Sequence, residues 1–392
     1  MGMVERSATH VAKVAASDLT LPAELSRRRL RTRLLIATGV LLTIIAAVTL
    51  LPGLGELRSR LAHAKPGWLV LGVALKLLSG LGYVAVFRMV FCRRMSWRVS
   101  YQIGMSELGA NALFPTGGAG GLALGAWALR RGGMAAREIA RRSVAFFLLT
   151  SVPNVVGVIV VGLGLAVGLL AGERNLLLSA VPAAVAAAAV KGTLLAGRDA
   201  AQRGDREPRS SQLRVTRRAR ALRASLTALG DGIPEALVLL REANFVLILG
   251  LLAYLVFDVT ILWATFRAIG PAPPIGLLAM GYLIGELGGL IPIPGGIGGI
   301  DAGLVGTLVL YHVPLTAAAG AVLAYRTIAI WVPAIVGSAA FVALRRTLRR
   351  EADAIAVCAP HTEIELIGVG RATIRGDHGA AGTTGAADSL VS

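Results

Sequence analysis

Long apolar segments alternate with short basic ones along most of the chain. A helix needs about 20 consecutive apolar residues to cross the hydrocarbon core of a bilayer. Six segments meet this criterion and are predicted to span a membrane: residues 34–52, 67–87, 143–168, 175–195, 243–266 and 316–344. The pattern therefore predicts an all-α polytopic membrane protein.

Two further apolar segments, 99–128 and 275–311, are interrupted by residues that break helices. The first contains FPTGGAGG (114–121), and the second contains IPIPGGIGGID (291–301). Proline and glycine both disfavour a helix interior. About eight residues remain between the first break and Arg130, too few to cross ~30 Å of hydrocarbon at about 1.5 Å per residue. We therefore expect each segment to form a re-entrant helical hairpin, broken at a Gly/Pro-rich turn.

The second half of the chain repeats the first at an offset of 179 residues, or 180 for the last pair of motifs, with one extra residue in the first half at Thr116. Four pairs of motifs match in the same order: GLGE (53–56) with GIPE (232–235), FR (87–88) with FR (266–267), ELGANALFPTGGAGG (107–121) with ELGGLIPIPGGIGG (286–299), and PNVVG (153–157) with PAIVG (333–337). Each half then has three spans and one hairpin, so the second half is inverted relative to the first. Counting each hairpin as two full spans gives the same inversion. Inverted repeats with interrupted helices at matching positions are typical of transporters, with the substrate site at the interruptions.

Clusters of arginine orient the predicted helices. Five arginines lie within 27–33, and further clusters lie at 88–98, 130–142, 198–223 and 345–350. Cytoplasmic loops are enriched in Lys and Arg, so we expect both termini to be cytoplasmic and the protein to lie in the cytoplasmic membrane. Only Arg58, Arg60 and Lys65 fall on the opposite side. The chain then divides into an N-terminal cytoplasmic segment (1–30), a first transmembrane half (31–170), a second half (171–344) that includes the Arg-rich cytoplasmic loop 196–242, and a largely disordered cytoplasmic tail (345–392).

The composition supports a membrane protein and narrows its partners. Hydrophobic residues make up 55% of the chain and charged residues 16%, against about 25% charged in typical globular proteins. The net charge of +18 could indicate nucleic-acid binding, but the arginines lie at the ends of apolar segments, which indicates topology and contact with anionic lipid headgroups. Cys92 and Cys358 are too few for a disulfide scaffold or a cysteine metal site. We expect no cofactor, no metal and no nucleic-acid partner.

The candidate substrate-binding residues lie at the two breaks and in the helices beside them. Irregular backbone at membrane depth survives only when it is buried in protein or lines a wet cavity, and glycine leaves its N–H group open. Buried carboxylates in a membrane are functional candidates by default. The candidates are Glu107, Pro115, Gly117, Gly118, Glu286, Pro294, Gly295, Gly296, Gly298, Gly299, Asp301 and Arg326. We assign no catalytic residue.

Each of these groups also has a purely structural interpretation. The pairs Gly117/Gly121 and Gly295/Gly299 have GxxxG spacing, which can serve close helix packing alone. Asp301 is expected to cap the half-helix that follows it.

The charged residues are open to the same two interpretations. Glu286 and Arg326 either bind a headgroup or form a structural ion pair. Lys76 and Asp258 are isolated charges within spans. We expect Lys76 to snorkel to the membrane surface and Asp258 to make a polar contact between helices.

The segments PIPGGIGGID (292–301) and AYRTIAIWVPAIVG (324–337) resemble the flippase-like transmembrane domain of lysylphosphatidylglycerol synthases, or multiple peptide resistance factors. The resemblance covers residues 30–345, and Asp301 stands where the family pattern has Glu. Members with the full enzyme carry a large soluble aminoacyl-transfer domain after the membrane part. Only a short polar segment follows here, so we expect no synthase activity. The resemblance implies translocation of a phospholipid, a polyprenyl-linked lipid or another amphiphilic lipid between leaflets.

The leading expectation is therefore a lipid flippase whose partners are membrane lipids with anionic headgroups. One alternative is an ion- or proton-coupled carrier of a small anion. Another is a non-transporting membrane subunit of a cell-envelope lipid-modifying complex. An enzyme is not expected, because the sequence has no metal-ligand cluster and no nucleophile motif. A homo-oligomer and a cell-envelope enzyme partner both remain open.

Overall fold

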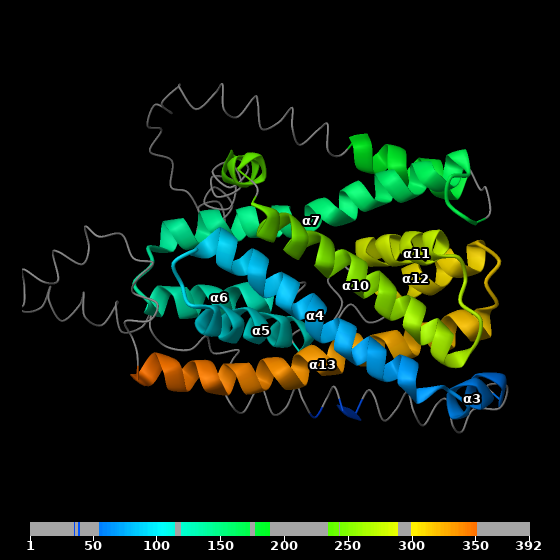
Figure 1. Ribbon diagram of the computed structural model, residues 1–392, viewed down its shortest axis with the longest axis horizontal. Helices are drawn as coiled ribbons and strands as arrows, with labels where there is room; N and C mark the ends of the chain where they lie inside the picture. Colours follow the sequence, from blue (N-terminus) through cyan, green and yellow to red (C-terminus); the bar gives the residue numbers. More distant parts are fainter. Residues whose placement is uncertain are drawn as a thin grey trace, which may run out of the picture.

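The computed structural model describes residues 35, 38–39, 55–113, 119–172, 177–188, 234–242, 244–288 and 299–350. These residues form α-helices joined by short connections, and they contain no strand (Figure 1). The all-α prediction is confirmed for this part of the chain. The labelled helices are α3 (Gly55–Ala62), α4 (Pro66–Phe91), α5 (Trp97–Leu113), α6 (Ala119–Arg131), α7 (Ala136–Val167), α10 (Phe245–Ile269), α11 (Ile275–Gly288), α12 (Gly299–Leu310) and α13 (Leu315–Arg350).

Helices α4, α7, α10 and α13 are long and apolar enough to cross a membrane. They correspond to the predicted spans 67–87, 143–168, 243–266 and 316–344. Large apolar side chains such as Leu81, Val160 and Leu249 stay exposed on them, which suits contact with lipid chains. The predicted span 175–195 is described only as the helix Leu177–Ala188, and the predicted span 34–52 lies almost entirely outside the described residues.

Two pairs of shorter helices occupy the segments that were predicted to be broken. Helices α5 and α6 flank residues 114–118, and α11 and α12 flank residues 289–298; both intervening stretches lie outside the described residues. Within each pair the helices lie side by side (Figure 1). A Cβ added to Gly121 would lie 2.6 Å from the Glu107 carbonyl oxygen, and one added to Gly303 would lie 3.2 Å from the Gly285 Cα. Small residues therefore allow close contact within both pairs.

Helices α4 and α10 cross at the centre of the molecule and run antiparallel. The backbone N–H of Lys65, just before α4, donates to the carbonyl oxygen of Ala268 near the end of α10 at 2.8 Å. Farther along, Gly82 of α4 meets Gly250 of α10, and a Cβ on either would lie 2.9 Å from the carbonyl oxygen of the other. Two glycines facing each other bring the two backbones into contact, as small residues do between membrane helices.

Each shorter helix pair also packs on a long helix from the other half of the sequence. Helix α5 crosses α13 where a Cβ on Gly109 would lie 2.8 Å from the Gly337 Cα. Helix α11 contacts α7, where a Cβ on Gly157 would lie 3.2 Å from the Leu283 side chain. The two halves of the chain are therefore interlocked rather than separate bodies.

We expect Gly337→Ala to destabilise the protein, because the new Cβ would overlap the Met105 carbonyl oxygen and the Gly109 backbone. Overpacking of this kind costs about 1–3 kcal/mol. Thermal unfolding in detergent measures it. The matched control is Gly306→Ala in α12, where a Cβ would meet nothing within 4 Å. This control should unfold at or above the wild-type temperature, since alanine favours helix over glycine by up to about 1 kcal/mol. Equal effects of the two substitutions would show that α5 and α13 do not depend on this contact.

Candidate functional site

Polar side chains gather in the interior where α4 crosses α10. Lys76 Nζ donates to both carboxylate oxygens of Asp258 at 2.9 Å, and Ser79 Oγ donates to Asp258 Oδ1 at 2.9 Å. The Tyr282 hydroxyl on α11 donates to Asp258 Oδ2 at 3.4 Å, and Lys76 Nζ lies 5.7 Å from the centroid of the Tyr254 ring. We call these five residues the crossing cluster. The side chains of Lys76 and Asp258 are only 11% and 3% exposed, so this ion pair is shielded from solvent.

Glu286 extends the crossing cluster along α11. Glu286 is half-buried and lies one helical turn beyond Tyr282. Asp258 acts on it with a repulsive charge, and Lys76 and Arg326 act on it with attractive charges. Glu286 therefore lies near charges of both signs, between the α4–α10 crossing and α13.

Asp301 and Arg326 form an ion pair between α12 and α13. The Arg326 Nε lies 2.8 Å from Asp301 Oδ1. Helix α12 begins at Gly299, so Asp301 lies inside its first turn, where the helix dipole favours a negative charge. The capping role expected for Asp301 is thus wrong, because residues 299–301 already belong to the helix. The structural ion pair that was one of two interpretations for Glu286 and Arg326 is formed by Asp301 and Arg326 instead.

In the first half of the chain, Glu107 of α5 contacts the neighbouring helices α4 and α6. It is 1% exposed, and its Oε2 accepts a hydrogen bond from the Tyr83 hydroxyl of α4 at 3.0 Å. A Cβ on Gly125 of α6 would overlap its Oε1, so only glycine admits the carboxylate at that point. One turn along α5, Asn111 Oδ1 accepts from the Gly121 backbone N–H at 2.8 Å. Glu107 therefore ties α4, α5 and α6 together.

Three buried tyrosines and the half-buried Tyr254 link these groups into one interior path. The rings of Tyr83 and Tyr254 lie 6.1 Å apart, which connects the α5 glutamate to the crossing cluster. The rings of Tyr282 and Tyr325 lie 6.3 Å apart and edge-on, which connects the crossing cluster to α13 beside Arg326. Polar side chains therefore run through an apolar interior from one helix pair to the other.

The structure brings several of the residues proposed from sequence together. Glu286, Asp301 and Arg326 lie around α11, α12 and α13, while Glu107 belongs to a second group around α5 and α6. Gly299 is the first residue of α12. The remaining candidates lie outside the described residues: Pro115, Gly117, Gly118, Pro294, Gly295, Gly296 and Gly298.

Sequence reasoning missed the centre of the site. The contact expected between Asp258 and another helix is confirmed, but the snorkelling expected of Lys76 is wrong, because its ammonium turns inward to Asp258. Ser79 was not considered. A signal existed, because Ser79 and Asp258 are separated by 179 residues, the same offset as the sequence repeat. Equivalent positions of two antiparallel helices meet where those helices cross.

The chemistry of this site is that of charge pairing and hydrogen bonding. In the part of the chain that the structure describes, no group of three or more His, Cys, Asp or Glu side chains could hold a metal ion.

The family model described as "Lysylphosphatidylglycerol synthase TM region" matches residues 34–337 of the chain. A search of curated proteins found no match. The matched region contains the crossing cluster, both glutamates and the Asp301–Arg326 pair.

Proposed function

We propose a lipid-translocating function from one premise: the chain belongs to the family of the lysylphosphatidylglycerol synthase transmembrane region. That family points to a lipid-related role in a membrane. Our proposal is that the protein moves a phospholipid, a polyprenyl-linked lipid or another amphiphilic lipid between the leaflets of the cytoplasmic membrane. It would act as a transporter and not as an enzyme.

The crossing cluster is the observation that carries this proposal. Lys76 and Asp258 lie in the middle third of α4 and α10, the two helices at the centre of the molecule. Ionisable groups at such depth in a membrane are expensive and mark substrate or ion pathways. Polar groups at mid-depth offer a passing headgroup hydrogen bonds that lipid chains cannot supply.

An inverted repeat is the architecture that we propose for this pathway. At the offset of 179 residues, α4 is equivalent to α10, and these two helices run antiparallel. The α5–α13 crossing has a counterpart in the contact of α11 with α7, so each half packs on the other in the same way. Antiparallel packing of equivalent helices is what inversion requires, and it supports alternating access around a fixed central site.

The two ends of the molecule carry similar arginine–tryptophan contacts. Arg88 lies 4.7 Å from the Trp97 ring centroid, and its repeat equivalent Arg267 lies 5.5 Å from that of Trp68. Arg88 and Arg267 lie in the last turns of the antiparallel helices α4 and α10, so they lie at opposite ends of the molecule. Tryptophan and arginine gather at membrane surfaces, which supports one membrane interface at each end.

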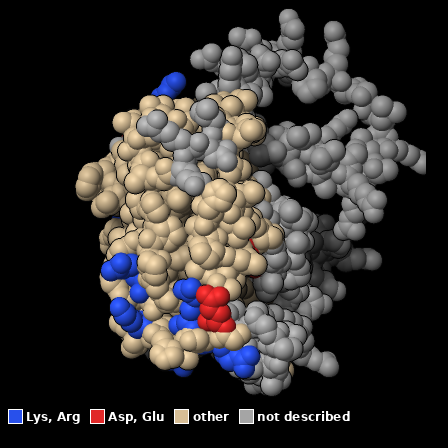
Figure 2. Space-filling model, turned by 90° about the vertical axis from the view of Figure 1, so that its right-hand side faces the viewer, with Lys and Arg blue, Asp and Glu red and all other residues tan. Residues whose placement is uncertain are grey.

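Basic side chains gather in the lower part of the end that Figure 2 shows, where α3 lies in Figure 1. Helix α3 and the turn after it contribute Arg58, Arg60 and Lys65. These are the same charges that oppose the proposed orientation. Arg60 is partly neutralised, because it donates to Glu56 at 2.8 Å and 3.1 Å. The proposed topology therefore rests on the larger arginine clusters, which lie at the helix ends opposite to α3.

In this proposal the α5–α6 pair is a re-entrant hairpin that enters from the cytoplasm, and α11–α12 is its counterpart from the outer side. Glu107 and Glu286 are equivalent in the repeat, so each hairpin brings one carboxylate to the interior path. The headgroup would pass along that path while the acyl chains remain in lipid. The Gly/Pro-rich tips lie outside the described residues and stay a prediction from sequence.

The direct test is lipid scrambling in proteoliposomes. We expect the purified protein to accelerate the movement of fluorescent phospholipid between leaflets, relative to protein-free vesicles of the same composition. A lack of acceleration across a panel of anionic and zwitterionic lipids would contradict the proposal.

The interior glutamates favour one other candidate, a proton-coupled carrier of a small anion. Proton-driven anion uptake without lipid movement would establish that candidate instead.

The orientation makes a separate prediction. In a background with Cys92 and Cys358 replaced by serine, Arg94→Cys between α4 and α5 should react with membrane-impermeant maleimide only from the cytoplasmic side. Pro271→Cys between α10 and α11 should react only from the outside, because antiparallel α4 and α10 end on opposite faces. Both positions are exposed. Labelling of both cysteines from the same side would exclude the inverted arrangement.

A further inference from the structure

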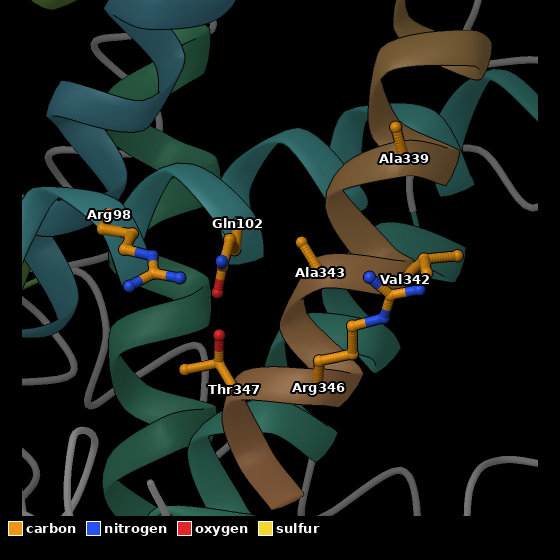
Figure 3. Close-up of a pocket in the computed structure, with 7 residues that line it drawn as sticks. All are labelled: Arg98, Gln102, Ala339, Val342, Ala343, Arg346 and Thr347. Carbon is orange, nitrogen blue, oxygen red and sulfur yellow. The ribbon is translucent and has the colours of Figure 1, made fainter. Parts of the chain in front are cut away.

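A pocket of about 340 Å³ opens between α5 and α13. Figure 3 shows its walls: α5 presents Arg98 and Gln102, Thr347 of α13 points toward Gln102, and Arg346 extends along α13 toward Val342. The rest of the wall is apolar and consists of Ala339, Val342 and Ala343. This pocket lies away from the crossing cluster, toward the ends of the helices that carry arginine clusters.

The pocket is cationic and contains a buried hydrogen-bond acceptor without a donor. It has two arginines and no carboxylate among its lining residues. Within the described residues, no acidic side chain pairs with Arg98 or Arg346. Gln102 is only 6% exposed, and its Oε1 atom is buried without a hydrogen-bond partner. A buried acceptor without a donor is rare in native structures and indicates a missing partner at that point.

An apolar groove of about 670 Å³ adjoins this pocket, and Arg98 lines both. The groove is formed by α4, α5 and α10, and its other lining residues are Leu81, Gly82, Val84, Ala85, Trp97, Tyr101, Phe245, Val246, Leu249, Gly250 and Ala253. Trp97 is 53% exposed beside Arg88, the position of a tryptophan at a membrane surface. A cationic pocket at headgroup depth beside an apolar groove has the two chemistries of a phospholipid.

We propose that the pocket and the groove together bind one anionic phospholipid. Arg98 and Arg346 bind the phosphate diester, since guanidinium groups pair with phosphate oxygens by charge-assisted hydrogen bonds. A donor of the headgroup, such as a glycerol hydroxyl, satisfies Gln102 Oε1. An acyl chain occupies the groove between α4 and α10. This docking site is independent of translocation, because it requires binding alone.

The experiment measures binding of phosphatidylglycerol to the full chain in zwitterionic detergent by native mass spectrometry. Phosphatidylcholine and soluble glycerol 3-phosphate are the comparison ligands, one lacking net charge and the other lacking acyl chains. The test variant is Arg98→Gln/Arg346→Gln. The matched control is Arg93→Gln/Arg94→Gln, which removes the same charge from two exposed arginines of the α4–α5 connection that do not line the pocket.

Phosphatidylglycerol should bind at least about tenfold more tightly than either comparison ligand, and the test variant should weaken it by about tenfold. The control should stay within about twofold, because Arg93 and Arg94 do not line the pocket. Gln102→Leu should retain the wild-type unfolding temperature and weaken phosphatidylglycerol binding, since it replaces the carboxamide that carries the unmet acceptor with an apolar side chain of similar size.

Four results would overturn the proposal. Equal losses of phosphatidylglycerol affinity in the test and control variants would show that binding depends on the overall positive charge and not on this pocket. Equal affinity for glycerol 3-phosphate would make this a site for a soluble phosphate ester, and no binding of phosphatidylglycerol by the full chain would reject the site. If the double arginine variant fails to fold, the phosphatidylglycerol affinity of the Gln102→Leu variant tests the site instead. Unchanged phosphatidylglycerol affinity in that folded variant would reject the site.

Discussion

Replacing Asp258 with Asn should lower the free energy of unfolding by about 3–5 kcal/mol, because it leaves the Lys76 ammonium buried without its counter-charge. Lys76→Met should have a similar effect, since it leaves the Asp258 carboxylate unpaired. The double variant Lys76→Met/Asp258→Asn removes both charges and keeps an oxygen that can accept from Ser79 and Tyr282. It should therefore recover most of the lost stability.

Chemical unfolding in detergent measures all three variants. The control is Glu56→Gln, which breaks the exposed i,i+4 pair with Arg60 and should leave stability unchanged. Lipid translocation is measured alongside. We expect the double variant to fold and yet remain inactive, because the crossing cluster has lost both of its charges. Wild-type translocation by that variant would assign the ion pair to structure alone. A double variant as unstable as the singles would show that the two charges do not compensate each other.

The long helices were predictable because their signal is local. An apolar window of about 20 residues indicates a span whatever it packs against, and α4, α7, α10 and α13 follow that signal. Helices α5 and α11 lie in the segments directly before the predicted breaks, whose own residues lie outside the described part of the chain. Sequence alone therefore located the helices that carry Glu107 and Glu286.

The pairing of charges was not predictable in the same way, because it depends on which helices cross. Lys76 could have snorkelled along an isolated α4, and only the antiparallel contact with α10 offers it Asp258. Arg326 had two acidic candidates in its half, and the packing of α12 on α13 selected Asp301. Glu107 fits beside α6 only because residue 125 is glycine, a fact that the sequence contains but does not explain.

Glu107→Gln and Glu286→Gln should fold normally and lose translocation. Glutamine keeps the shape of the side chain, and its carbonyl oxygen can still accept from Tyr83 at position 107. A headgroup donor would lose a charge-assisted hydrogen bond of about 1.5–3 kcal/mol, which corresponds to a rate about ten- to a hundredfold lower. Both variants should be affected, because an inverted repeat presents its two carboxylates to the pathway in turn. Scrambling assays with thermal unfolding of each variant provide the measurement.

Tyr83→Phe separates a working carboxylate from one that only holds helices together. This variant removes the 3.0 Å hydrogen bond to Glu107 while leaving the carboxyl group in place. If Glu107 serves structure, Tyr83→Phe should destabilise the protein more than Glu107→Gln does, because it leaves a buried carboxylate without its donor. If Glu107 serves the substrate, Tyr83→Phe should retain more translocation than Glu107→Gln. Normal translocation by both Gln variants would remove the glutamates from the pathway. The crossing cluster and the Asp301–Arg326 pair would then be the charged groups left to handle a headgroup among the described residues.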